Sequence, residues 1–87
     1  MVDMSRVTSA IIGMHLRQLR KESGLTQRQV AERFNVPQSF VSKLEVGRRK
    51  ISLYEMILYV QALDANPNEF VATIGKSMVD HIHEVKE

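Results

Sequence analysis

Apolar residues recur three and four positions apart in five separate stretches of this chain, and no stretch alternates convincingly as a strand would. Such spacing places the apolar side chains on one side of an α-helix. In the first stretch Ile12, Leu16 and Leu19 follow it, and Ser23-Gly24 closes the stretch because glycine readily takes the left-handed conformation that ends a helix. The pattern predicts an all-α, five-helix chain, with four core helices in about residues 8–65 and a C-terminal helix in about residues 67–85.

The second and third predicted helices are separated by a very short turn. Thr26 and Gln29 form a capping box, which starts the second helix, and this helix runs to Phe34 with Val30, Ala31 and Phe34 buried. After it the chain is expected to turn sharply within about three residues, so that two helices of about eight residues cross steeply.

The residues of the turn explain why it is short. Asn35 tolerates the left-handed conformation better than most residues, and Pro37 has a φ suited to a helix start. Proline also disfavours α geometry at the residue before it. The third helix then turns Val41 and Leu44 inward and ends at Gly47.

Two further capping signals define the last helices. Ser52 and Glu55 form a second capping box, and Asn66-Pro67-Asn68-Glu69 combines an asparagine cap with proline at the first helical position. The apolar positions of the fourth helix are Leu53, Met56, Ile57, Val60 and Leu63, and those of the fifth are Phe70, Val71, Ile74, Met78, Ile82 and Val85.

Length and composition restrict the class of protein. A chain of 87 residues is expected to form one domain, residues 1–87, and 44% hydrophobic with 25% charged residues is ordinary for a folded chain. Without cysteine it has no disulfide framework and no thiolate metal site. No apolar run approaches the roughly 20 residues that span a bilayer. We therefore expect a cytoplasmic protein with no membrane partner.

Charge is distributed unevenly along the chain although the net charge is only +2. Residues 17–50 hold nine basic and three acidic side chains, whereas the rest of the chain holds three basic and seven acidic ones. This asymmetry suits a basic face that meets a polyanion. A solvated basic face without any partner explains the charge equally well, so both interpretations stay open at this point.

The polar side of the third helix has the chemistry of base recognition. Opposite Val41 and Leu44 it carries Gln38, Ser39, Ser42 and Lys43. A DNA major groove accepts one α-helix, in which glutamine pairs with adenine, lysine with guanine and serine with either. The alternative is a polar face that only meets solvent.

The stretch LRQLRKESGLTQRQVAERFNVPQSFVSKLEVGRRKISLYEMILYVQAL, residues 16–63, resembles the DNA-binding domain of the Xre family of helix-turn-helix regulators, related to the lambda repressor and Cro. The most specific elements are Gly24-Leu25-Thr26-Gln27, Val30-Ala31, Val41-Ser42-Lys43-Leu44-Glu45 and Gly47. The resemblance implies a five-helix lambda-repressor-like domain, a recognition helix in the third position, and operator binding as a dimer.

The resemblance also assigns roles to residues. Base reading is implied for Gln38, Ser39, Ser42 and Lys43, and phosphate binding for Gln27, Arg28, Arg48, Arg49 and Lys50. A phosphate near Gln27 also suits the partial positive charge of a helix N-terminus. Glu45 matches a position that is more often structural, so it is not expected to face DNA.

Three positions depart from the family pattern. Asn35 replaces a frequent glycine, which the left-handed conformation permits. Pro37 stands where relatives often have a serine or threonine cap, so the first amides of the third helix are expected to be open to a phosphate or to water. Val46 replaces a common polar residue, and it either loses a backbone contact or gains one to a thymine methyl group.

Catalytic and metal chemistry are not predicted. His81 and His83 are two positions apart, about 200° around a helix, and cannot hold one metal ion from that helix. No organised set of serine, histidine and carboxylate appears, and no glycine-rich phosphate loop. We expect neither an enzyme nor a cofactor.

Two functions therefore remain. The first is sequence-specific binding of double-stranded DNA by a homodimer on an inverted repeat, whose subunit contact would involve Tyr54, Leu58, Met78 and Ile82. For Tyr54 and Leu58 the alternative is that the last helix covers them. The second function is that of a protein-interaction module, such as an antitoxin or an antagonist of another regulator, whose partner the sequence does not identify.

Overall fold

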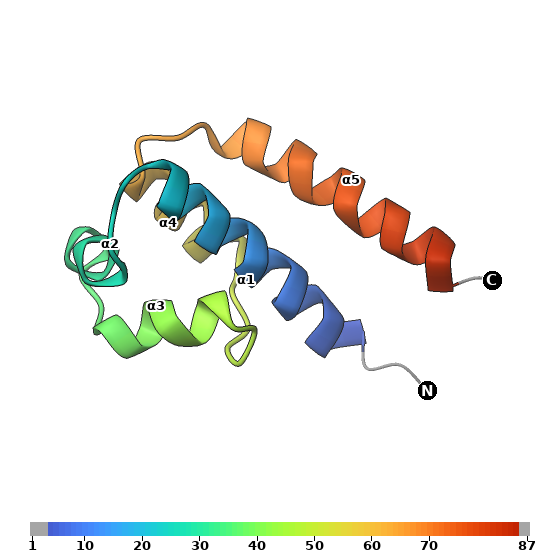
Figure 1. The fold of residues 1–87 in the computed structure, drawn as a ribbon, viewed down its shortest axis with the longest axis horizontal. Coiled ribbons are helices and arrows are strands. Elements are labelled where there is room, and N and C mark those ends of the chain that lie inside the picture. The colour runs from blue at the N-terminus through green and yellow to red at the C-terminus, as the bar shows by residue number, and fades with distance from the viewer. Residues whose placement is uncertain (1–3, 86–87) are drawn as a thin grey trace.

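The computed structural model describes residues 4–85, which form five α-helices and no strand. They are α1 (Met4–Glu22), α2 (Gln27–Phe34), α3 (Gln38–Glu45), α4 (Leu53–Ala62) and α5 (Pro67–Val85) (Figure 1). The predicted all-α class and all five helices are confirmed. The first helix begins at Met4 rather than near residue 8, so its helical part is longer than the apolar pattern indicated.

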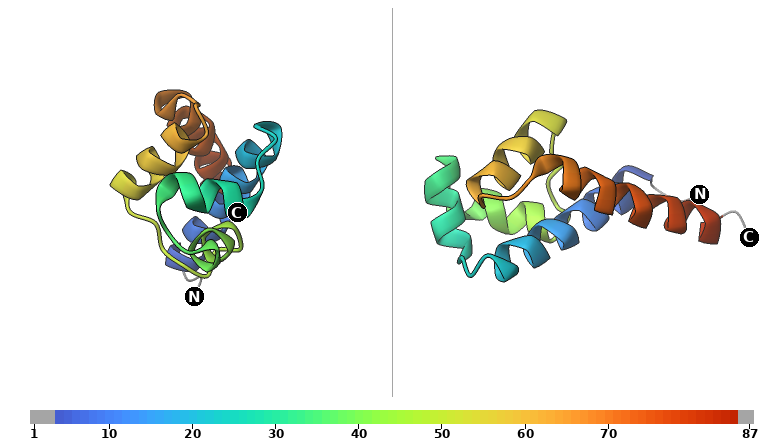
Figure 2. Two further views of the ribbon diagram at one scale, coloured as in Figure 1. Left: turned by 90° about the vertical axis from the view of Figure 1, so that its left-hand side faces the viewer. Right: turned by 90° about the horizontal axis from the view of Figure 1, so that it is seen from above.

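The helices form an elongated molecule of 42 × 24 × 21 Å. α1 and α5 run antiparallel, side by side, and their outer ends project together beyond the other helices (Figures 1 and 2). α2 packs on α3 and α4, and α1 packs on both α3 and α5. α1 therefore connects the helix pair α2–α3 with the long C-terminal helix.

The core lies where α1 to α4 and the first half of α5 meet. Its fully buried large side chains are Tyr59, Leu16, Leu44, Val30, Val41 and Val60. Phe70 and Ile74 extend the core along α5, and Met78 packs against it while partly exposed. The predicted inward positions of α3, Val41 and Leu44, are confirmed.

Three expectations about burial are wrong, at Leu53, Phe34 and Val71, the last of which is 44% exposed although it belongs to the apolar pattern of α5. The apolar pattern assigns Leu53 to the buried side of α4, but its side chain is 66% exposed, because that side is centred on Met56, Tyr59, Val60 and Leu63 and the first turn is left uncovered. Phe34 is half-buried instead of buried. Its ring packs beside those of Phe40 and Tyr59, at centroid distances of 5.6 and 6.2 Å.

The capping predictions of the last two helices are confirmed. The Ser52 hydroxyl accepts from the Glu55 amide at 3.0 Å, and the Glu55 carboxylate accepts from the Ser52 amide at the same distance. At the start of α5 the Asn66 side chain accepts from the Asn68 amide at 2.8 Å. The side chain of Val85 lies outside the described residues.

Glycines let α1 and the end of α3 approach each other closely. A Cβ atom on Gly13 would lie 2.2 Å from the carbonyl oxygen of Leu44, and one on Gly47 would lie 2.8 Å from the Cα of Ala10. Gly47 also has a φ of +76°, a conformation that favours glycine. These contacts fix the end of α3 and the start of the loop that follows it.

Candidate nucleic-acid interface

The two helices α2 and α3 are joined as the sequence predicted. Thr26 and Gln29 complete a capping box at the start of α2, and Asn35 ends the helix with φ 58° and ψ 47°. Pro37 occupies the N-cap position of α3 with φ −64° and provides no side-chain hydrogen bond. The backbone of the turn is held by the Val36 amide, which donates to the carbonyl oxygen of Ala31 at 3.0 Å.

The outer face of α3 carries the four residues that are predicted to read bases. Gln38, Ser39 and Lys43 are exposed and Ser42 is half-buried. Among residues 4–85 their side chains make no hydrogen bond or ion pair with the rest of the molecule. The four polar groups are therefore brought together on one surface and are free to bind an external partner. Val46, one turn further along, is exposed as well.

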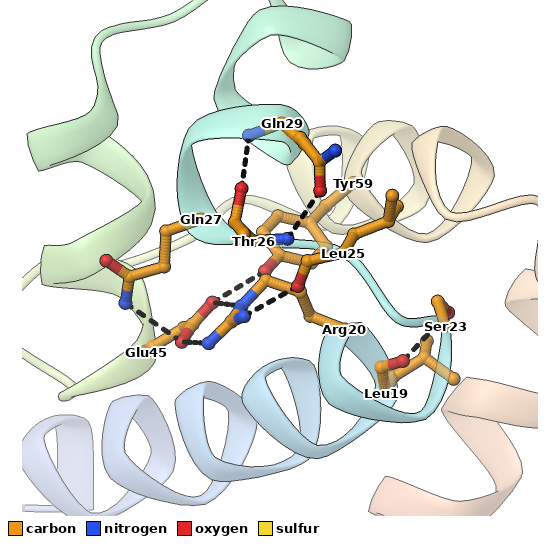
Figure 3. A network of polar contacts seen from close by, with 9 residues as sticks. All are labelled: Leu19, Arg20, Ser23, Leu25, Thr26, Gln27, Gln29, Glu45 and Tyr59. Carbon is orange, nitrogen blue, oxygen red and sulfur yellow. Dashed lines mark hydrogen bonds and ion pairs between the residues drawn. The ribbon is translucent and has the colours of Figure 1, made fainter.

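The inner face of α3 is fixed by a buried ion pair (Figure 3). Arg20 of α1 donates from Nε and Nη2 to the two carboxylate oxygens of Glu45, at 2.7 and 2.9 Å. Only 8% of Arg20 and 5% of Glu45 is exposed. The Tyr59 hydroxyl donates to Glu45 at 2.9 Å, and the Arg20 Nη1 donates to the Leu25 carbonyl oxygen at 2.8 Å. Glu45 thus faces the core, as expected for a structural position.

The titration of Glu45 depends on this network. Burial by itself would raise the pKa of its carboxyl group, but the hydrogen bonds from Arg20, Gln27 and Tyr59 outweigh burial and hold the pKa below its ordinary value. The hydrogen bond to Glu45 raises the pKa of Arg20, and burial followed by the charge of Glu45 raises the pKa of Tyr59. Arg20 and Glu45 therefore remain charged at neutral pH.

Sequence patterns did not identify Tyr59 and Arg20 as parts of this site, although a signal for Arg20 was present. Arg20 follows Leu16 by four positions and thus lies on the buried side of the first helix, and Glu45 directly follows the buried Leu44. Two opposite charges on the inner faces of two helices indicate a buried pair. Tyr59 had a signal too, because it follows Met56 by three positions and precedes Leu63 by four, which places it on the apolar side of the fourth helix.

Gln27 and Arg28 lie in the first turn of α2. Gln27 is half-buried, and its amide nitrogen donates to Glu45 at 3.1 Å, so the side chain is tied to the buried ion pair. In Figure 3 its amide oxygen points away from Glu45. Arg28 is exposed and pairs loosely with Glu32, at 3.9 Å.

The loop between α3 and α4 holds the other three predicted phosphate ligands. Arg48, Arg49 and Lys50 are all exposed. The guanidinium of Arg49 lies over the Phe40 ring, 4.2 Å from its centroid, and pairs with Glu55 at 3.6 Å. Within the described part of the chain, the side chains of Arg48 and Lys50 have no such partner. The loop that follows α3 thus carries two cations that are unpaired within the described residues.

The four residues predicted for a subunit contact come from two helices, α4 and α5. Tyr54 is 71% exposed in the first turn of α4, so the alternative that α5 covers it is wrong, and Leu58 is half-buried. Met78 and Ile82 belong to α5, where Ile82 is 42% exposed. The first turn of α4 and the last turns of α5 lie apart in both views of Figure 2.

A groove of about 270 Å³ lies elsewhere, between α1 and the start of α5, and is lined by His15, Leu19, Glu69 and Phe70 among others. No residue of α3 contributes to it. Among residues 4–85 no cluster of three metal-ligating side chains occurs, and none of their helices combines the length and apolarity required to cross a membrane.

Comparison with known proteins agrees with this geometry. The profile of the helix-turn-helix family matches residues 16–70. An uncharacterized HTH-type transcriptional regulator of Sinorhizobium fredii, y4dJ, is 41% identical over 64 residues, which cover 70% of this chain and 79% of that protein.

Two solved structures are similar as well. The restriction-modification controller protein C.AhdI of Aeromonas hydrophila has a TM-score of 0.68 at 33% identity, and the match covers 74% of this chain and 97% of the C.AhdI chain. The clp gene regulator ClgR of Corynebacterium glutamicum has a TM-score of 0.75 at 30% identity, and the match covers 82% of this chain and 92% of the ClgR chain. The chain belongs to the Xre family of helix-turn-helix transcriptional regulators, a family of DNA-binding proteins and not of enzymes.

Proposed function

We propose that this chain binds double-stranded DNA in a sequence-specific manner, as a small transcriptional regulator that reads base edges with the outer face of α3. One observation carries the proposal. Gln38, Ser39 and Lys43 are exposed without a partner in the described residues, while Val41 and Leu44 fix the opposite side of the same helix in the core. A polar helix face held rigidly outward is what direct readout in a major groove requires.

The chemistry of the face defines the bases it suits. A glutamine amide pairs with the N6 and N7 atoms of adenine, a lysine ammonium with O6 and N7 of guanine, and a serine hydroxyl with either. Val46 offers an apolar contact to a thymine methyl group. We therefore expect a mixed site rather than one restricted to A·T or G·C pairs.

Contacts to the DNA backbone orient the helix. Gln27 and Arg28 are at the N-terminus of α2, where the helix dipole favours an anion. The basic loop of Arg48, Arg49 and Lys50 follows α3 directly. Backbone contacts carry no sequence information, but they position the reading face, and we assign them to Gln27, Arg28, Arg48 and Lys50.

We also propose that the regulator is a homodimer on an inverted repeat. One domain of this size reads few base pairs, and a two-fold dimer places two recognition helices in successive major grooves about 34 Å apart. α5 leaves Val79 and Ile82 at its outer end exposed, which suits a contact with a second copy.

The first test is selection of bound sequences from a random duplex pool, followed by affinity measurements with Lys43→Ala. This variant should lose about 1–3 kcal/mol and relax the preference at one base position of each half-site. Lys76→Ala is the matched control, because Lys76 is an exposed lysine on α5, away from α3. An unchanged sequence preference in Lys43→Ala would contradict the assignment of α3 as the reading helix.

The second test separates DNA binding from protein interaction. The association constant for DNA should fall steeply as the salt concentration rises, because each phosphate contact releases a counterion. Solution mass should correspond to a dimer. A flat salt response, with no sequence selected from the pool, would favour the protein-interaction module instead.

A further inference from the structure

Phe40 of α3 lies at the border between the buried side of the helix and its proposed reading face. It lies between the exposed Ser39 and the buried Val41 and is itself half-buried. Its ring packs beside Phe34, whose own ring meets the buried Tyr59 edge-on. The Phe40 ring is thereby held by a row of aromatic side chains that begins in the core.

The guanidinium of Arg49 rests on this ring. Its Cζ is 4.2 Å from the ring centroid, within the range of a cation–π contact, and its Nη2 is 3.6 Å from the Glu55 carboxylate. Glu55 is itself fixed, because its other carboxylate oxygen accepts from the Ser52 amide at 3.0 Å. Arg49 therefore connects α3 with the first turn of α4 across the loop that joins them.

The neighbours of Arg49 differ from it in one respect. Arg48 and Lys50 are exposed, and in the part of the chain that the structure describes their side chains have no ring or carboxylate partner. The backbone of the loop is anchored at its start, where the Arg48 amide donates to the Lys43 carbonyl oxygen at 2.9 Å. Because Arg49 lies between Arg48 and Lys50, its contacts with Phe40 and Glu55 restrict the positions that these two side chains can reach.

We propose that Arg49 is a positioning residue, which rests on the DNA-binding function proposed above. It holds the loop against Phe40 and Glu55, so that Arg48 and Lys50 are presented to the DNA backbone, and it binds no phosphate itself. The charge of Arg49 is already paired and one face of its guanidinium is covered, whereas its two neighbours have neither constraint.

Salt dependence distinguishes positioning from phosphate binding. The experiment measures the affinity of the full chain for its selected duplex over a range of salt concentrations, in Arg48→Gln, Arg49→Gln and Lys50→Gln. Arg48→Gln and Lys50→Gln should each reduce the slope of log K against log[salt] by about one per subunit. Arg49→Gln should weaken binding about fivefold with the slope unchanged. A slope reduced as much as in its neighbours would overturn the proposal.

The ring of Phe40 provides an independent variant that alters no charge. Phe40→Leu should weaken DNA binding as much as Arg49→Gln does. Phe40→Tyr keeps an aromatic ring under the guanidinium and should bind DNA with wild-type affinity. The double variant Phe40→Leu/Arg49→Gln should bind no more weakly than either single variant, because both remove one contact. Additive losses would overturn the proposed linkage.

A measurement on the free protein separates this inference from the DNA-binding function. NMR relaxation of the backbone amides should report faster local motion at residues 48–50 in Arg49→Gln and in Phe40→Leu, but not in Arg48→Gln. Unchanged relaxation in Arg49→Gln would overturn the positioning role, whatever the affinities. A wild-type chain that selects no duplex would instead overturn the proposed function, even if the relaxation changes as expected.

Discussion

At the scale of single residues, the carboxylate of Glu45 connects four of the five helices, α1 to α4. It belongs to α3 and accepts hydrogen bonds from Arg20 of α1, Gln27 of α2 and Tyr59 of α4 (Figure 3). A buried charge pair contributes little net stability over an apolar pair, but removal of one partner leaves a costly buried charge. Loss of Glu45 would therefore both destabilise the domain and release α3 from its contacts with α1, α2 and α4.

Glu45→Gln should be strongly destabilising for this reason. The neutral amide leaves the Arg20 guanidinium buried without a counter-charge, and we expect a loss of about 3–5 kcal/mol in the free energy of unfolding. Urea denaturation followed by circular dichroism measures it. Arg20→Met/Glu45→Leu, which removes both charges, is the control and should be more stable than Glu45→Gln; the reverse order would contradict the role of the unpaired charge.

The lowered pKa of Glu45 also predicts how stability depends on pH. A carboxyl group whose pKa is lower in the folded than in the unfolded state stabilises the fold fully above its ordinary pKa, and this contribution is lost as the pH falls through the lowered value. The free energy of unfolding should therefore decrease below about pH 4.5, the ordinary value for glutamate.

The effect of Glu45 on this acid titration can be isolated. The pKa of Glu55 is also lowered, chiefly by its hydrogen bond from the Ser52 amide, so part of the pH dependence should persist in Glu45→Gln. The slope of unfolding free energy against pH should be clearly smaller in that variant than in the wild type. Equal slopes would exclude Glu45 as a source of acid sensitivity.

At the scale of elements, the distance between α1 and α3 is set by glycine. Gly13 lies where a side chain of α1 would meet the backbone carbonyl groups at the end of α3, whereas a Cβ atom on Gly75, in the middle of α5, would meet no atom within 4 Å. The two glycines are both helical but their surroundings are opposite. Only the first one is required for packing.

Alanine substitution at these glycines should therefore act in opposite directions. Gly13→Ala should lower the free energy of unfolding by about 1–3 kcal/mol, because a methyl group overpacks the contact between α1 and α3. Gly75→Ala should raise it by about 0.5–1 kcal/mol, because alanine favours the helix and meets no neighbour. Thermal unfolding of both variants measures this, and a stabilising Gly13→Ala would refute the close approach.

At the scale of the whole molecule, the two ends carry different surfaces. α2, α3 and the basic loop lie at one end and carry the proposed reading face and most of the exposed cations, whereas α1 and α5 project together toward the other end (Figure 1). Val79 and Ile82, in the outer half of α5, are exposed apolar side chains. This separation would let a dimer form through α5 while the reading faces stay open.

Ile82→Glu should convert the proposed dimer into a monomer. A charge in an apolar contact is costly to desolvate, and loss of the second subunit removes the gain from binding two half-sites, which we expect to weaken operator binding about 100-fold or more. Analytical ultracentrifugation and DNA titration measure the two effects. Ala72→Glu makes the same charge change at an exposed position of α5 and is the control. A dimer that persists in Ile82→Glu would place the contact elsewhere.

Predictability from sequence differed between these scales. Caps and turns are decided by a few adjacent residues, so Thr26, Asn35 and Ser52 sufficed to predict where α2 begins and ends and where α4 begins. Burial depends on which side of a helix its neighbours cover. For that reason the apolar pattern misplaced Leu53 and left out Tyr59, and only the packing of α4 showed which of the two is buried.

The sequence by itself determined the helices, the sharp turn between α2 and α3 and the set of polar groups on the outer side of α3, because all of these follow from local conformational preferences and helical periodicity. The tertiary structure alone decided that Arg20, Gln27 and Tyr59 meet at Glu45, that Gly13 sets the distance between α1 and α3, and that Arg49 rests on Phe40. Those contacts join residues far apart in the chain or on different helices, and such pairings depend on how the helices pack.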